Sequence, residues 1–96
     1  MRNDSIFMDY RDTMMKADRL EELAGELRRI AEELRNPIAD DYWHGEAKSV
    51  YEKKNSRLYQ RTIAHAAQLD RQAKGMRDAA TRLYQVEKWA AQQAGL

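Results

Sequence analysis

The chain contains no cysteine and only one proline among its 96 residues. Without cysteine, neither a disulfide framework nor a thiolate site for zinc or an iron–sulfur cluster is available. No stretch approaches the roughly 20 apolar residues of a membrane-spanning helix, and the first residues, MRNDSIFMDYRD, lack the apolar run of a signal peptide. We therefore expect a chain that is cytoplasmic at first and that, if exported, becomes secreted or cell-surface without a cleaved signal peptide.

Glycine is scarce as well, and the helix breakers divide the chain in two. Pro37 and Gly45 are the only proline and glycine that lie close together. The residue before a proline is disfavoured in the α region, so a first helix should end near Asn36. A length of 96 residues suits one small domain. The sequence thus predicts a single helical-hairpin domain over residues 1–96, with a helix at about 4–36, a turn at about 37–45 and a helix at about 46–94.

Apolar residues recur at helical spacing in both predicted helices. In the first they are Ala17, Leu20, Ala24, Leu27, Ala31 and Leu34, with Leu23 and Ile30 beside them. The second has two seven-residue rows, Asn55, Thr62, Leu69, Met76, Leu83, Ala90 and Tyr51, Leu58, His65, Gln72, Ala79, Val86, with Ala66, Ala73 and Ala80 alongside. These rows predict packing seams with many small and polar members, among them His65 as a hydrogen-bonded seam residue.

Charge is divided unevenly between the two halves. Residues 1–45 hold seven Lys and Arg against eleven Asp and Glu, a net charge of −4, and residues 46–96 hold ten against five, a net charge of +5. This difference favours an antiparallel hairpin. The charges serve mainly to specify how the two helices pair, because surface ion pairs contribute only about 0–1 kcal/mol each to stability. Two independently solvated charged faces are the alternative interpretation.

The predicted helices differ in length. At about 1.5 Å per residue they span roughly 50 and 70 Å, so we expect about the last fifteen residues of the second helix to overhang the first. A hairpin buries one stripe of each helix and leaves its neighbours exposed. We therefore predict an all-α fold in which an antiparallel two-helix hairpin assembles as a four-helix bundle dimer, with itself or with a similar protein.

The segment WHGEAKSVY opens the second predicted helix. Trp43 can cover apolar surface at the end of a bundle, and Gly45 allows the chain to turn tightly into the helix. Together with Ala47 and the aromatic Tyr51, the segment gives the pattern W-x-G-x-A followed by an aromatic residue. This pattern, in the turn of a predicted helical hairpin of this size, resembles the WXG superfamily of small proteins handled by type VII (Esx) secretion.

The resemblance implies a non-enzymatic function. Such proteins pair as helical-hairpin dimers, are recognised by the membrane ATPase of the secretion machine, and in some cases escort a larger toxin. The family's tail signal is a Tyr followed four residues later by an acid, whereas here Tyr84 is followed at that spacing by Lys88, with Glu87 one residue early. That shift turns the acid by about 100° on the helix. A partner with an intact tail is therefore favoured, either a similar hairpin or the helical N-terminal domain of an LXG-type toxin, and ordinary packing of Tyr84 remains open.

The sequence gives little support for catalysis or metal binding. No nucleophile stands in a supporting constellation and no pocket is expected in a narrow bundle, so we predict no catalytic residues, no cofactor and no small-molecule substrate. The acids Asp40, Asp41 and Glu46 are typical of a helix start and His44 of a solvated loop, so no metal is expected there.

A basic run on the second helix comprises Lys53, Lys54, Arg57 and Arg61. With a near-zero net charge and an acidic helix alongside, this run predicts a solvated face rather than a nucleic-acid site. The alternative to a secretion role is a structural coiled-coil adaptor unrelated to secretion.

Overall fold

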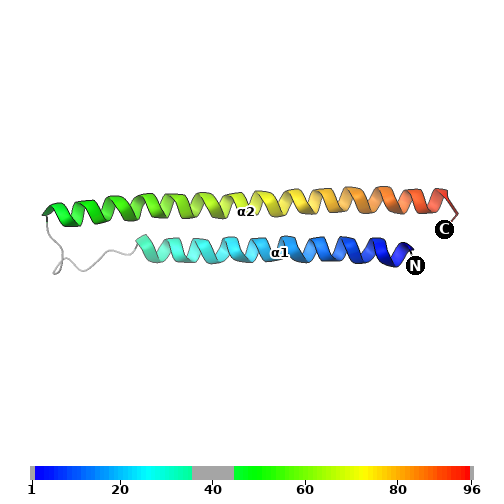
Figure 1. Cartoon of the computed structure of the whole chain (residues 1–96), viewed down its shortest axis with the longest axis horizontal. Coiled ribbons are helices and arrows are strands. Elements are labelled where there is room, and N and C mark those ends of the chain that lie inside the picture. Colours follow the sequence, from blue (N-terminus) through cyan, green and yellow to red (C-terminus); the bar gives the residue numbers. More distant parts are fainter. Residues whose placement is uncertain (1, 36–44, 96) are drawn as a thin grey trace.

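The computed structural model describes the backbone of residues 2–35 and 45–95 and, apart from those of residues 2–6 and 8, their side chains. This part of the chain forms two α-helices, α1 (Arg2–Arg35) and α2 (Gly45–Gln93), and contains no strand. The helices lie side by side and antiparallel in a rod of 75 × 15 × 10 Å (Figure 1). The all-α class and the helical hairpin are therefore as predicted.

Glycines in the left-handed region stand at both ends of α2. Gly45, the first residue of the helix, has φ +64°, and Gly95, just beyond its end, has φ +76°. At the carboxyl end the amide of Ala94 donates to the carbonyl of Ala90 at 3.0 Å and that of Gly95 to Gln92 at 3.1 Å, which satisfies two of the last helical carbonyls. Glycine is suited to both positions because side chains disfavour positive φ.

Replacing glycine by alanine is expected to change the free energy of unfolding in opposite directions at Gly45 and Gly75. Gly45→Ala is expected to lower the free energy of unfolding by about 1 kcal/mol, because alanine is strained at positive φ. Gly75→Ala should raise it by about 0.5–1 kcal/mol, because Gly75 lies within α2 and nothing approaches its added Cβ within 4 Å. Urea unfolding followed by circular dichroism measures both. Equal stabilisation by the two alanines would contradict the left-handed start of α2.

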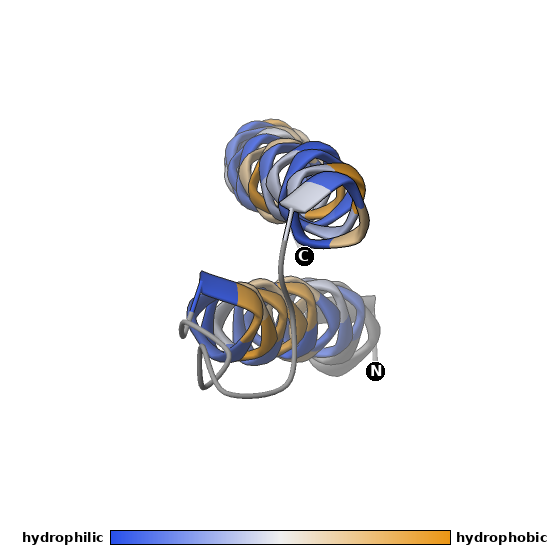
Figure 2. Ribbon diagram, turned by 90° about the vertical axis from the view of Figure 1, so that its left-hand side faces the viewer, coloured by the Kyte–Doolittle hydropathy of each residue, from blue (hydrophilic) through white to orange (hydrophobic). Residues whose placement is uncertain are grey.

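Only alanine side chains are enclosed between the helices. Among the described residues the buried ones are Ala17, Ala24, Ala31, Ala66, Ala73, Ala80 and Ala91. Three of them are seven residues apart on α1 and three on α2, which places an alanine row on each helix at the contact. Viewed along the rod, each helix carries both hydrophobic and hydrophilic stripes (Figure 2). Because alanine is small, such rows let two helix axes approach closely while burying little apolar surface.

The alanine rows change the predicted seam of α2. Ala66 and Ala73 have no exposed surface, whereas His65, expected at the seam, is exposed. The row that contains His65 lies one residue before the alanine row, so α2 is turned by about 100° relative to an arrangement centred on that row. His65 therefore does not lie in the seam between α1 and α2, and its place in a seam with a second hairpin stays a prediction.

The overhang lies at the opposite end from the one expected. Near the end of α1, Arg35 lies over the ring of Tyr59 at 5.1 Å and the carbonyl of Leu34 accepts a hydrogen bond from Asn55 at 3.1 Å. Residues 45–54 of α2 therefore extend past α1, while the amino end of α1 lies beside the carboxyl end of α2 (Figure 1). The estimate failed because it assumed that both helices start level at the turn.

Candidate protein interaction surface

The hairpin leaves its large apolar side chains incompletely covered. Within the described residues, no side chain larger than alanine is fully buried. The accessible surface is 7778 Å², whereas a compact monomer of this mass exposes about 5,700 Å². The excess of roughly 2,000 Å² is as large as the surface that stable protein interfaces bury. The single hairpin therefore exposes more surface than a compact protein of its mass.

One flank of the hairpin carries ion pairs between the helices. Arg77 of α2 donates to Asp18 at 2.5 Å and to Glu21, and Arg28 of α1 donates to Asp70. The hydrogen bond to Glu21, followed by that to Asp18, raises the pKa of the Arg77 guanidinium above its ordinary value. We call these five residues the charged flank. Because exposed pairs contribute about 0–1 kcal/mol each, they serve mainly to fix the register of the two helices.

The opposite flank is apolar. Leu23 and Ile30, one residue before alanines of α1, are 51% and 45% exposed, and Leu58 and Val86 of α2 are 45% and 61% exposed. On α2 the row Leu58, His65, Gln72, Ala79 and Val86 contains no Lys, Arg, Asp or Glu. By helical spacing these rows lie across the alanine seam from the charged flank. We call Leu23, Ile30, Leu58 and Val86 the apolar flank.

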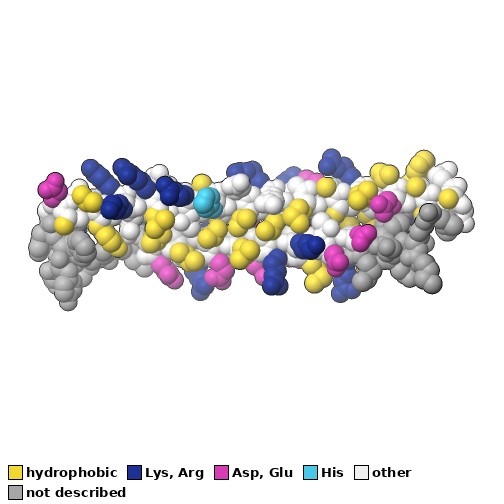
Figure 3. All heavy atoms as spheres, viewed as in Figure 1, with side chains coloured by type: hydrophobic (Ala, Val, Ile, Leu, Met, Phe, Trp, Pro, Cys, Tyr) yellow, Lys and Arg dark blue, Asp and Glu magenta, His cyan; other side chains and the backbone are white. Residues whose placement is uncertain are grey.

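The apolar flank continues into the seam between the helices. Its neighbours toward the seam are only partly covered: Leu20, Leu27, Leu34, Leu69 and Met76. A space-filling view shows hydrophobic side chains along the line where the helices meet, with many charged ones toward the outer edges (Figure 3). The asymmetry of the two flanks therefore defines a single face on which a further helix pair can pack.

The described residues of the predicted motif, Gly45, Ala47 and Tyr51, lie on the part of α2 that extends past α1. Trp43 lies outside the described residues, and Gly45 begins α2. Ala47 is exposed and Tyr51 is half-buried. The predicted tail residues Tyr84 and Glu87 lie near the other end, so the fold does not bring the two groups together.

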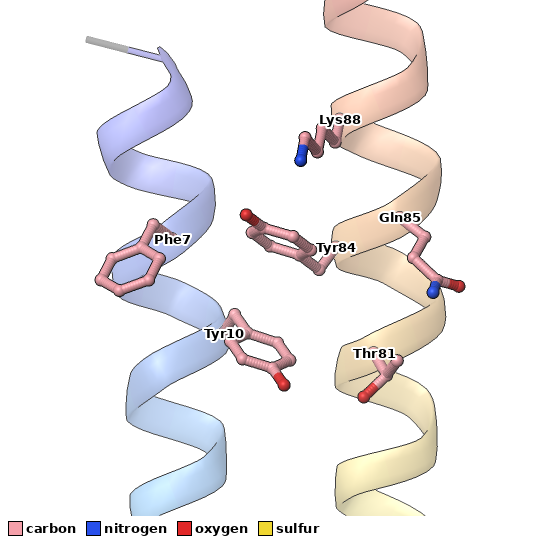
Figure 4. A pocket seen from close by; sticks show the side chains of 6 residues that line it. All are labelled: Phe7, Tyr10, Thr81, Tyr84, Gln85 and Lys88. Carbon is pink, nitrogen blue, oxygen red and sulfur yellow. The ribbon is translucent and has the colours of Figure 1, made fainter.

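Tyr84 packs against α1 rather than on an overhang. Its ring centroid lies 5.0 Å from that of Tyr10 at an interplanar angle of 45°, and the Lys88 ammonium lies 5.9 Å from the Tyr84 centroid. Figure 4 shows Tyr10 and Tyr84 reaching toward one another between the helices. An open pocket of about 370 Å³ there is lined by Phe7, Tyr10, Thr81, Tyr84, Gln85 and Lys88. Glu87 instead lines a smaller neighbouring depression of about 60 Å³, which also contacts both tyrosines.

Sequence reasoning missed the contribution of Phe7 and Tyr10 to this end of the rod. The aromatic pair in the first turns of α1 was a usable signal, but pairing it with Tyr84 required the register. Trp89, in contrast, is 62% exposed. The Tyr84 ring is thus engaged within the hairpin, while Trp89 remains available on the surface.

The described part of the chain contains neither a cluster of metal ligands nor a helix that could span a membrane. Residues 2–35 and 45–95 contain no group of three or more His, Asp or Glu arranged to hold a metal ion, and neither α1 nor α2 is long and apolar enough to cross a membrane. Of the residues weighed as metal ligands, Glu46 lies in the first turn of α2 as predicted, and Asp40, Asp41 and His44 lie outside the described residues. Compared with models of protein families, curated proteins and solved structures, the chain has no significant match.

Proposed function

We propose that this protein is a non-enzymatic helical-hairpin interaction protein that pairs through the apolar flank with a second hairpin, forming a four-helix bundle. The observation that carries the proposal is the exposure of Leu23, Ile30, Leu58 and Val86 beside a seam that encloses only alanine. Fully burying a large aliphatic side chain contributes about 1.5–3 kcal/mol, so covering the remaining half contributes roughly 1 kcal/mol each. Association has its own entropic cost, and a stable pair must therefore also cover the half-buried seam leucines.

The partner is a second helical hairpin rather than an isolated extended peptide. The exposed rows on both helices repeat every seven residues along much of the rod, and knobs from facing helices fit such rows. The charged flank remains outside such a bundle. Its ion pairs then stay in water, where they carry no large desolvation cost.

We further propose a role in type VII secretion, as a substrate or as a targeting partner of the WXG kind. Supporting this are the W-x-G-x-A pattern and the positive φ of Gly45 at the start of α2, where glycine is favoured. The engagement of Tyr84 with Tyr10 supports a partner that supplies the tail signal, such as another hairpin or the helical N-terminal domain of an LXG-type toxin. The membrane ATPase of the secretion machine would then recognise the assembled pair.

Trp43→Ala tests the secretion role in cells with an active type VII system. We expect at least a tenfold loss of the protein from the extracellular fraction, while light scattering still gives an assembled mass above 11.3 kDa. Trp89→Ala, which removes the other tryptophan, is the matched control and should leave export unchanged. Undiminished export of the Trp43 variant would favour a structural coiled-coil adaptor, and its dissociation would make Trp43 a structural cap.

A further inference from the structure

The side of α2 that faces away from α1 is strongly basic. We define the basic face by six exposed residues of α2: Lys53, Lys54, Arg57, Arg61, Arg71 and Arg82. None of them has an ion-pair partner within residues 2–35 and 45–95. Two acids, Glu46 and Asp78, share this side of the helix, and Asp78 already pairs with Lys74 at 3.2 Å. The face therefore has a clear excess of positive charge.

The acids of α1 do not cancel this charge. They lie largely on the outer edge of α1 or pair within the hairpin, as Glu26 does with Arg29. The rod is 15 Å across its second axis, so its outer edges lie nearly two Debye lengths apart at physiological ionic strength, where one Debye length is about 8 Å. Lys53 and Lys54 lie on the segment that extends past α1. The formal net charge of +1 thus conceals an edge of α2 that is rich in Lys and Arg, whereas acidic and basic side chains are mixed along the edge of α1 (Figure 3).

Apolar side chains accompany the cations at the two ends of the basic face. Val50 is 47% exposed and Trp89 is 62% exposed. Trp89 stands seven residues after Arg82, and thus on the same side of α2. Tryptophan is enriched where a membrane meets water, because its ring is apolar and its N–H is polar.

The shape of the rod distinguishes between kinds of polyanion. The cations extend along a nearly straight rod 75 Å long. A flat anionic surface meets all of them at once, whereas the phosphates of a duplex wind around its axis once per roughly 34 Å and meet a straight row only at intervals. The straight row and the exposed tryptophan together favour a lipid surface.

We propose that the basic face of α2 binds an anionic lipid bilayer peripherally, through lipid phosphate groups. The rod lies flat, with the cations at the headgroups and Trp89 at the interface. The apolar flank stays accessible in this orientation, since it lies beside the seam and not on the outer side of α2. The proposal is therefore independent of the pairing and secretion roles proposed above.

Vesicle co-sedimentation of the full chain tests this proposal. The probes are vesicles of phosphatidylcholine alone and of phosphatidylcholine mixed with phosphatidylglycerol. The wild type should bind only the anionic vesicles, and less as salt rises. The variant Lys53→Gln, Arg57→Gln, Arg61→Gln is expected to lose about 100-fold in partitioning at low salt. The control variant Arg11→Gln, Arg19→Gln, Arg29→Gln removes the same net charge from α1 and should bind like the wild type, with helicity checked for both.

Each alternative outcome contradicts the proposal. Equal losses in the two triple variants would mean that net charge, not the basic face, governs binding. Equal binding to neutral and anionic vesicles would show that the face does not recognise the net negative charge of the lipid. An absence of binding to anionic vesicles would show that the face is not a lipid site. Displacement of the protein from vesicles by an equal phosphate concentration of duplex DNA would assign the face to nucleic acid. Trp89→Ala should weaken vesicle binding several-fold, and an unchanged affinity would overturn the orientation with Trp89 at the interface.

Discussion

Ile30→Glu is expected to convert the assembled protein into monomers, whereas Met15→Glu leaves the assembly intact. Both substitutions place a carboxylate on α1 at a site that is already exposed in the single hairpin, 45% for Ile30 and 58% for Met15. In an isolated hairpin the two changes would thus have similarly small effects. Ile30 belongs to the apolar flank, and Met15 lies on the outer edge of α1.

The expected difference arises from burial of Ile30 in the proposed four-helix bundle. An unpaired carboxylate at a buried interface costs several kcal/mol, so Ile30→Glu should raise the dissociation constant by at least about 100-fold. Light scattering over a dilution series measures the mass, and circular dichroism follows helix content. Met15→Glu controls for the added charge, and Leu23→Glu should reproduce the Ile30 result. Equal masses for the Ile30 and Met15 variants would place the interface elsewhere.

Local signals in the sequence predicted the elements of the fold but not their mutual placement. Pro37 and Gly45 marked the break, and α1 ends at Arg35 and α2 begins at Gly45. The rotation of α2 about its axis was harder to predict. His65 and Ala66 are adjacent in the sequence, and each belongs to a row of residues that repeats every seven positions. A seam of alanines has little hydrophobic contrast with its neighbours. The closest packing, and not the largest side chains, decides which row faces α1.

The candidate interaction surface, too, could not be predicted without knowing how the two helices are placed against each other. Leu23 and Ile30 were recognised as widening the apolar stripe, but their exposure follows from the placement of the ion pairs on the other flank. The expected overhang at Tyr84 and Trp89 was wrong, because the register places the amino end of α1 beside that end of α2. The charge sums also did not show that the basic run lies on the side of α2 away from α1. Charge sums carry no information about which edge a residue occupies.

Ala73→Leu is expected to be the most disruptive single change within the hairpin. Ala73 has no exposed surface and lies in the middle of the α2 alanine row. Arg28 contacts Asp70 and Arg77 contacts Glu21, so this register places Ala73 at about the level of Ala24, which is equally enclosed. Three additional heavy atoms there must push the helix axes apart. Overpacking of this kind costs about 1–3 kcal/mol, and here it also strains the register of the ion pairs.

Ala64→Leu supplies the matched control for this substitution. Ala64 is an exposed residue of the same helix, and alanine and leucine both have high helix propensity, so this change should alter the free energy of unfolding by less than about 0.5 kcal/mol. Urea unfolding of both variants at one protein concentration gives the comparison. A loss at Ala73 no larger than at Ala64 would show that the helices do not approach through their alanine rows. A large loss confined to Ala73 would mean that the small side chains at the seam determine how the apolar flank is presented to a partner.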